Sequence, residues 1–164
     1  MNGADNEGAV AEFIANYLKE KHIDAFVQQI DETHANIIAK LEGKSSETVV
    51  WNGHLDTVPY GNTEEWNTDP SIPVERNGRI YARGASDMKS GLAAMVYLLG
   101  EIGESGEKPE QTILFLGTCD EEKSGLGAEK ILEEIDLSSG SLLLIGEPTG
   151  CKLGVAQKGC IWGI

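Results

Sequence analysis

Three continuous apolar runs along the chain alternate with segments of helical periodicity. The runs Val49 to Trp51, Thr112 to Leu116 and Ser141 to Ile145 lack an alternation of polar and apolar residues, which is typical of strands buried on both faces of a parallel sheet. Leu92 to Ile102 places its apolar residues on one helical face, and Ala128 to Ile135 predicts a further helix. This alternation predicts an α/β fold whose sheet is mostly parallel and flanked by helices.

The first part of the chain predicts one more helix. Between Val10 and Leu18 the apolar residues recur at helical spacing, Asp5 or Asn6 can cap the helix, and the pattern ends near His22. An imidazole in the last turn faces the negative end of the helix dipole, so we interpret His22 as structural.

Short β-prone runs and one long loop lie outside the alternation. Residues 25–30 and 36–41 are separated by a polar link and predict an edge hairpin before the first apolar run. From Tyr60 to Gly78 the chain is rich in Gly, Pro and Asn and predicts a loop, with Trp66 as its packing anchor. A loop of this length in a compact domain indicates a function. Lys152 to Ala156 predicts a further strand.

An acidic residue lies at the predicted start of the helix that precedes the second apolar run. Ser86 is the predicted N-cap, which places the Asp87 carboxylate near the positive end of the helix dipole. Gly91, Ala93 and Ala94 keep the first turns slim enough to pack closely against a neighbour. Stabilisation of the helix terminus would by itself also explain Asp87.

Charge and cysteine content narrow the classes of partner. The 164 residues include 27 Asp and Glu against 13 Lys and Arg, a net charge of -14, which argues against nucleic acid or an anionic membrane as partner. No run approaches the roughly 20 apolar residues of a membrane span and no signal-peptide pattern is present, so we expect a cytoplasmic protein. The spacing of Cys119, Cys151 and Cys160 indicates free thiols.

Acidic residues and one imidazole gather where the apolar runs end. His54 and Asp56 follow the first run. The triplet Asp120 to Glu122 follows the second run, and Glu147 follows the third. The C-terminal ends of parallel strands meet at one edge of a sheet, where ligands bind. A lone histidine can be a buried structural residue and an acidic triplet can be a solvated loop, but their coincidence with Asp87 predicts a metal site, since adjacent carboxylates need a neutralising cation or protons.

These residue types suit a dinuclear hydrolase. Imidazole and carboxylate ligands without thiolates favour zinc or a similar divalent ion. Two such ions polarise a carbonyl and activate a shared water, while one carboxylate off the metals carries the proton. Glu121 and Glu122 allow this division of roles, because neighbouring side chains in a turn point in different directions. Asp56 is placed to hold the His54 ring in one tautomer.

Four motifs in order resemble the family of cocatalytic zinc hydrolases that includes acetylornithine deacetylase, succinyl-diaminopimelate desuccinylase, aminoacylase and glutamate carboxypeptidase. The motifs are Gly53 to Pro59, Gly84 to Gly91, Asp120 to Glu122 and Gly146 to Thr149. The resemblance implies a zinc-peptidase-like catalytic domain that hydrolyses the amide bond of an N-acyl amino acid or short peptide. It also implies a homodimer with two zinc ions in each site, for which cobalt or manganese can substitute.

The resemblance further implies a role for each candidate residue. The implied roles are His54 and Glu147 on one zinc, Asp87 as the bridge, Glu122 on the second zinc, Glu121 as general base and Asp56 orienting His54.

The chain departs from the family pattern in two ways. Ala82 stands where such proteins often have Gly, a small change. The family takes the last ligand of the second zinc, a histidine, from far downstream, whereas this sequence stops at Ile164; His22 and His34 lie on elements that do not lead to the site. We therefore expect residues 1–164 to be a truncated, partial catalytic domain that lacks the lid and dimerisation domain, with the second zinc site one ligand short. Such a fragment is expected to be inactive by itself.

Two other classes of function compete with the hydrolase. A buried strand followed by Lys123 and Ser124 superficially resembles a phosphate-binding loop, but Glu122 stands where that motif needs Gly, and the neighbouring carboxylates would repel phosphate. A non-catalytic metal-binding protein would keep the ligands and lose the chemistry. Within the family, a dipeptidase or aminopeptidase is the alternative to a deacylase.

Overall fold

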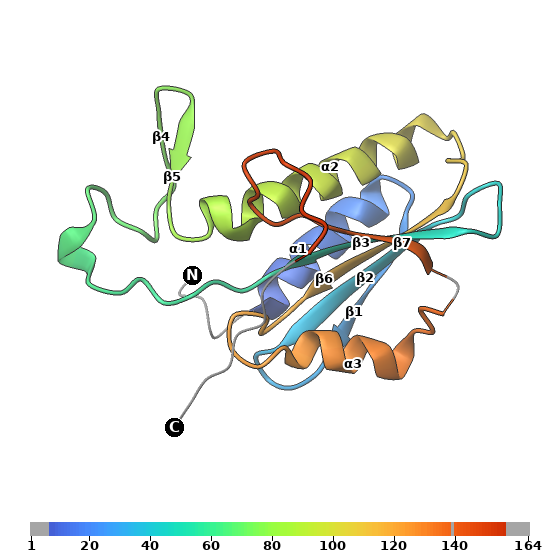
Figure 1. Cartoon of the computed structure of the whole chain (residues 1–164), viewed down its shortest axis with the longest axis horizontal. Helices are drawn as coiled ribbons and strands as arrows, with labels where there is room; N and C mark the ends of the chain where they lie inside the picture. The colour runs from blue at the N-terminus through green and yellow to red at the C-terminus, as the bar shows by residue number, and fades with distance from the viewer. Residues whose placement is uncertain (1–6, 139, 157–164) are drawn as a thin grey trace.

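A computed structural model describes residues 7–138 and 140–156. The elements in chain order are α1 (Glu7–Glu20), β1 (Asp24–Gln29), β2 (Ala35–Leu41), β3 (Thr48–His54), η1 (Thr63–Glu65), β4 (Val74–Arg76), β5 (Arg79–Tyr81), η2 (Ala85–Lys89), α2 (Ser90–Ser105), β6 (Thr112–Thr118), α3 (Leu126–Glu134) and β7 (Gly140–Ile145). Figure 1 shows α1 and α2 on one face of the main sheet, α3 on the other, and the β4–β5 hairpin projecting from the body.

The main sheet is mixed, and most of its strands share one direction. Its order is β1-β2-β6-β3-β7, in which β3 is parallel to both β6 and β7, while β2 is antiparallel to β1 and β6. Among these five strands only β2 therefore runs against the others. The predicted α/β class and the predicted edge hairpin β1–β2 are confirmed.

β6 is buried along its whole length, as predicted, and its successive side chains belong to two different parts of the core. Ile113 and Phe115 pack with residues of α1 and α2, whereas Leu114 and Leu116 pack with Ile131 of α3. Successive side chains of a strand point to opposite faces, so a continuous apolar run serves two helix layers at once. This packing holds β6 at the centre of the sheet, next to β3.

The prediction that Ser141 to Ile145 is a buried strand is correct for the strand and wrong for the burial. β7 is the last strand of the sheet and pairs with β3. Its apolar side chains are exposed, from 41% at Leu144 to 58% at Leu142. The described helices lie over other strands, since α2 contacts β3 and α3 contacts β2. An apolar run favours burial but does not specify which layer will cover it.

The start of α2 also differs from the prediction. The helix begins at Ser90, and Asp87 has the non-helical angles φ -115° and ψ 104° within the preceding turn η2. Ser86 is therefore not an N-cap. Gly84, in the left-handed region at φ 77°, immediately precedes η2, and its carbonyl accepts a hydrogen bond from the Lys89 N–H at 2.9 Å. Since Asp87 lies before the helix, its carboxylate is free to point toward the sheet.

The predicted first helix is confirmed as α1, with differences at its ends. The prediction that His22 lies in the last turn is wrong, because α1 ends at Glu20 and His22 follows it in the left-handed region at φ 63°. The candidate caps Asp5 and Asn6 lie outside the described residues.

The remaining predictions concern the long loop, the last strand and the thiols. The loop is anchored by Trp66, whose Nε1 donates to the Tyr60 carbonyl at 2.9 Å. The prediction of a strand at Lys152 to Ala156 is wrong, because this segment is irregular. Cys119 and Cys151 are free thiols as predicted, and Cys160 lies outside the described residues.

Within residues 7–138 and 140–156, no helix combines the length and apolar character that a membrane span requires.

Candidate metal centre

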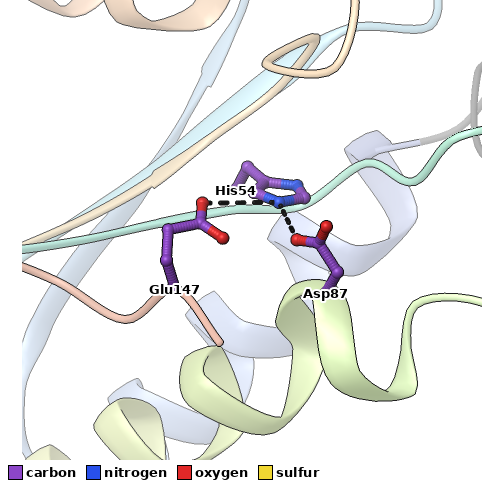
Figure 2. Close-up of side chains that lie close together, drawn as sticks. All are labelled: His54, Asp87 and Glu147. Atoms are coloured by element: carbon purple, nitrogen blue, oxygen red, sulfur yellow. Dashed lines mark hydrogen bonds and ion pairs between the residues drawn. The ribbon is translucent and has the colours of Figure 1, made fainter. Parts of the chain in front are cut away.

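Side chains from three elements meet at the C-terminal edge of the parallel strands (Figure 2). His54 is the last residue of β3, Glu147 follows β7 by two residues, and Asp87 precedes α2. Each offers one ligand atom, and these atoms lie within 4.8 Å of one another. His54 Nε2 is 3.1 Å from Asp87 Oδ1 and 3.8 Å from Glu147 Oε1. A cation with bonds of about 2 Å fits among ligand atoms spaced in this way.

Close packing around Met88 explains why the three side chains converge. Met88 is fully buried, and its Sδ accepts a hydrogen bond from the His54 N–H at 3.1 Å. A Cβ on Gly53 would lie 2.8 Å from Met88 Cε, and a Cβ on Gly146 would lie 3.0 Å from the same atom. Each glycine immediately precedes a candidate ligand and Met88 immediately follows one. The contacts that bury Met88 therefore also fix the separation of the ligands.

Helix α2 makes a second close approach, at Gly91. A Cβ on Gly91 would lie 2.0 Å from the Gly146 carbonyl oxygen, which leaves no room for a side chain. The predicted close packing at the start of this helix is thus found at Gly91, whereas Ala93 and Ala94 are exposed. Backbone contact at this point brings the turn that carries Asp87 against the segment that carries Glu147.

Asp56 holds the ring of His54. The ring Nδ1 lies 3.1 Å from the Asp56 backbone oxygen and 3.4 Å from Asp56 Oδ1, which turns Nε2 toward Asp87 and Glu147. Burial lowers the pKa of His54, but hydrogen bonds with Asp56 and Asp87 and the charge of Glu147 outweigh burial and raise this pKa to about 9. A cation bound here must therefore displace a proton from the imidazole.

The carboxylate of Asp56 also joins β3 to the loop that carries Glu121 and Glu122, the acidic pair. Its Oδ1 accepts a hydrogen bond from the Glu121 N–H at 3.1 Å, and its Oδ2 accepts one from the Glu122 N–H at 3.0 Å. Burial raises the pKa of Asp56, but bonds from His54 and the two amides bring it below its ordinary value. Asp56 is therefore an ionised link between the imidazole and the acidic loop.

Glu121 and Glu122 lie beside the three clustered side chains. Glu121 is exposed and Glu122 is half-buried, and neither belongs to the group of ligand atoms within 4.8 Å. Burial and the charge of Asp87 raise the pKa of Glu122, and burial and the charges of Asp87 and Glu121 raise the pKa of Glu147, although His54 opposes both. Carboxylates that raise one another's pKa repel, and a divalent cation would relieve that repulsion.

His34 lies nearer to the site than the sequence indicated. Its Nδ1 binds Asp31 Oδ2 at 2.8 Å, and its Nε2 is 3.9 Å from Asp120 Oδ1. The β1–β2 turn that carries His34 therefore lies against the loop that follows β6. The ring nevertheless faces Asp31 and Asp120 rather than the three clustered side chains.

Sequence reasoning missed a positioning role for Lys89. Its ammonium donates to the Leu55 carbonyl at 2.6 Å and so ties the start of α2 to the turn after β3. Lys89 and Asp56 also line a cavity of about 890 Å³, and His54, Asp87 and Glu147 are not among its lining residues. A single lysine near a helix start leaves no signal of such a contact in the sequence.

Comparison with known sequences identifies related proteins. Residues 50–159 match the sequence profile of peptidase family M20/M25/M40. A probable succinyl-diaminopimelate desuccinylase of Staphylococcus aureus strain Mu50 is 35% identical over 155 residues, which cover 94% of this chain and 38% of that protein. The succinyl-diaminopimelate desuccinylase of Paracidovorax citrulli is 38% identical over 113 residues, covering 67% of this chain and 29% of that protein.

Solved structures share the fold. A metallo-carboxypeptidase of the M20 family from Sulfolobus solfataricus superposes with a TM-score of 0.74 at 21% identity, covering 85% of this chain and 32% of that structure. Human carnosine dipeptidase 1 superposes with a TM-score of 0.70 at 24% identity, covering 84% of this chain and 32% of that structure. The arrangement of sheet and helices described above is therefore that of zinc-peptidase catalytic domains.

Proposed function

The chain belongs to peptidase family M20/M25/M40, and on this basis we propose that it is the metal-binding part of a hydrolase that removes the acyl group from an N-acyl amino acid. The convergence of His54, Asp87 and Glu147 at one sheet edge carries this proposal. The relatives at 35% and 38% identity are named for desuccinylation, which supports an N-succinyl amino acid as substrate. A dipeptidase of the same family is the alternative.

We propose that these residues would hold two zinc ions, or cobalt or manganese in their place. His54 and Glu147 would hold one ion, Glu122 would hold the other, and Asp87 would be shared by both. The repulsion among these carboxylates supports this assignment. When bound, such a pair of ions polarises the amide carbonyl and lowers the pKa of a shared water.

Glu121 is proposed to transfer the proton of the attacking water, and Asp56 to hold the groups around it in place. Glu121 takes a proton from the attacking water and delivers it to the leaving nitrogen as the amide C–N bond breaks. Its exposed carboxylate supports this role, because it remains accessible to substrate while Asp56 holds its backbone N–H. Asp56 holds the loop of Glu121 and Glu122 through their backbone N–H groups and holds the His54 ring in one tautomer, which would keep the base at a constant distance from the ligands.

Zinc titration of the isolated chain tests the assignment of ligands. We expect one tight site and a second site weaker by at least about tenfold, because the second has only Glu122 and the shared Asp87 from this chain. Isothermal titration calorimetry measures both affinities. His54→Ala should remove the tight site, whereas Glu129→Ala on the exposed face of α3 should leave it unchanged. Two equally tight zinc sites would contradict the assignment.

Assays of the complete protein test the reaction. N-succinyl-diaminopimelate should be hydrolysed with a higher kcat/KM than N-acetylornithine or simple dipeptides, and chelation should remove activity that zinc restores. Faster turnover of dipeptides would favour the alternative. Bound zinc without turnover of any of these amides would indicate a non-catalytic metal-binding protein.

The chain spans 38% of the length of the Staphylococcus relative, so further properties of the whole protein are proposals. We propose that residues 1–164 are part of a catalytic domain, and that the remainder supplies a lid, a dimer interface and the histidine of the second zinc. The complete enzyme is proposed to be a cytoplasmic homodimer.

A further inference from the structure

Asn36 is a buried polar residue of β2 that contacts both ends of the loop between β6 and α3. Its side chain is 0% exposed. Its Oδ1 accepts a hydrogen bond from the Cys119 N–H at 2.9 Å, and its Nδ2 donates to the Gly127 carbonyl at 2.9 Å and to Gln28 Oε1 at 2.7 Å. A buried amide is tolerated when its polar atoms are paired, and two of the three side-chain hydrogen bonds of Asn36 are to the ends of this loop.

The two ends of the loop are in backbone contact at the same place. The Gly127 N–H donates to the Cys119 carbonyl at 3.2 Å. A Cβ on Gly127 would lie 2.4 Å from that carbonyl oxygen and 2.6 Å from Asn36 Oδ1. Asn36 and a glycine at position 127 therefore act together to close the loop, which carries Glu121 and Glu122 between its ends.

The closed loop has one further anchor and an internal turn. The Ser124 and Gly125 N–H groups both donate to the Asp120 carbonyl, which makes the loop compact. Asp56 binds the amides of the acidic pair from the β3 side. Asn36 holds the base of the loop from the β2 side, 83 residues away in sequence from Cys119. The acidic pair is thus supported from the two strands that flank β6.

We propose that Asn36 is a positioning residue that sets the distance of Glu121 and Glu122 from the cluster of His54, Asp87 and Glu147. Asn36 is not one of the three clustered ligand residues, and it acts through its bonds to the loop. The inference rests on the proposed function for the roles of the acidic pair. It predicts that a change at Asn36 affects the second metal site and the base but spares the first metal site, whose ligands lie at the end of β3, in η2 and in the segment after β7.

The test uses Asn36→Asp in the complete protein. The carboxylate has the shape of the amide and can still accept from the Cys119 N–H, but it cannot donate to the Gly127 carbonyl. We expect kcat to fall about 10- to 100-fold with KM nearly unchanged, because a misplaced base costs rate more than binding. Cobalt titration followed by visible absorption should show the second equivalent binding about tenfold more weakly, with the first equivalent unchanged.

Two further variants make the result decisive. Gln28→Met removes the third hydrogen-bond partner of Asn36 and the bond from Gln28 Nε2 to the Lys130 carbonyl, but it leaves both bonds from Asn36 to the loop, so kcat and both cobalt affinities should stay close to those of the unaltered protein. Gly127→Ala displaces the amide by collision and should reproduce the Asn36→Asp result.

The proposal is wrong if Asn36→Asp and Gly127→Ala both leave the two cobalt affinities unchanged. It is also wrong if both variants weaken the first and the second cobalt site alike, because Asn36 would then have only a structural role. The cobalt readout needs no substrate, so failure of the hydrolase assay alone would count against the proposed function and not against this role of Asn36.

Discussion

Replacing Glu121 with glutamine is expected to lower the kcat of the complete enzyme by about 10²- to 10⁴-fold, the range typical of a lost general acid–base group. Glutamine keeps the shape of the side chain and the backbone bond to Asp56 but cannot take a proton from water. Because Glu121 is proposed as the base and holds neither ion in the proposed assignment, zinc should remain bound. Steady-state kinetics with metal analysis of the same sample measures both quantities.

Two comparisons identify the cause of the lost activity. Glu122→Gln removes a proposed ligand and should lower occupancy of the second metal together with the rate. Glu129→Gln replaces an exposed glutamate of α3 and should leave both unchanged. Unchanged turnover in Glu121→Gln would reject this residue as the base, and loss of zinc with turnover would make it a ligand instead.

Replacing Gly91 with alanine is expected to destabilise the protein by about 3 kcal/mol, at the upper end of the usual cost of overpacking. The added Cβ would lie 2.0 Å from the Gly146 carbonyl oxygen, so the backbones of α2 and the segment after β7 must separate. Helix propensity alone predicts the opposite sign, a gain of up to about 1 kcal/mol. Denaturant unfolding of both proteins measures the difference.

The same substitution should weaken the first metal site, because Gly91 and Gly146 bring Asp87 and Glu147 together. We expect a loss of at least about tenfold in zinc affinity, which calorimetry can measure in protein that is still folded. Gly154→Ala is the matched control, since the nearest atom to its added Cβ is 4.0 Å away. A Gly91→Ala protein as stable as the control, with unchanged zinc binding, would show that this contact does not set the site.

Much of the architecture follows from local pattern. The continuous apolar runs predict β3, β6 and β7, and the helical periodicity of Leu92 to Ile102 predicts α2, because side-chain direction repeats with the period of each element. The candidate ligands are also predictable, since the C-terminal ends of parallel strands share one edge of the sheet. His54, Asp87 and Glu147 meet there, within 4.8 Å.

Other features depend on residues that are far apart in sequence. The burial of β7 was predicted and is wrong, because an apolar run does not specify the layer that covers it. Sequence reasoning placed Asp56 beside His54 but missed its bonds to the amides of the acidic loop. It also missed the contact of Asn36 with that loop.

Local residue pattern is enough to specify which segments become strands and helices, and which residues lie at the ligand-binding edge of the sheet, because both follow from the character and spacing of neighbouring residues. The distance between the candidate ligands is set by tertiary contacts. That distance depends on Met88 packing between Gly53 and Gly146 and on Gly91 meeting a backbone carbonyl, contacts between segments whose separation along the chain leaves no periodic signal.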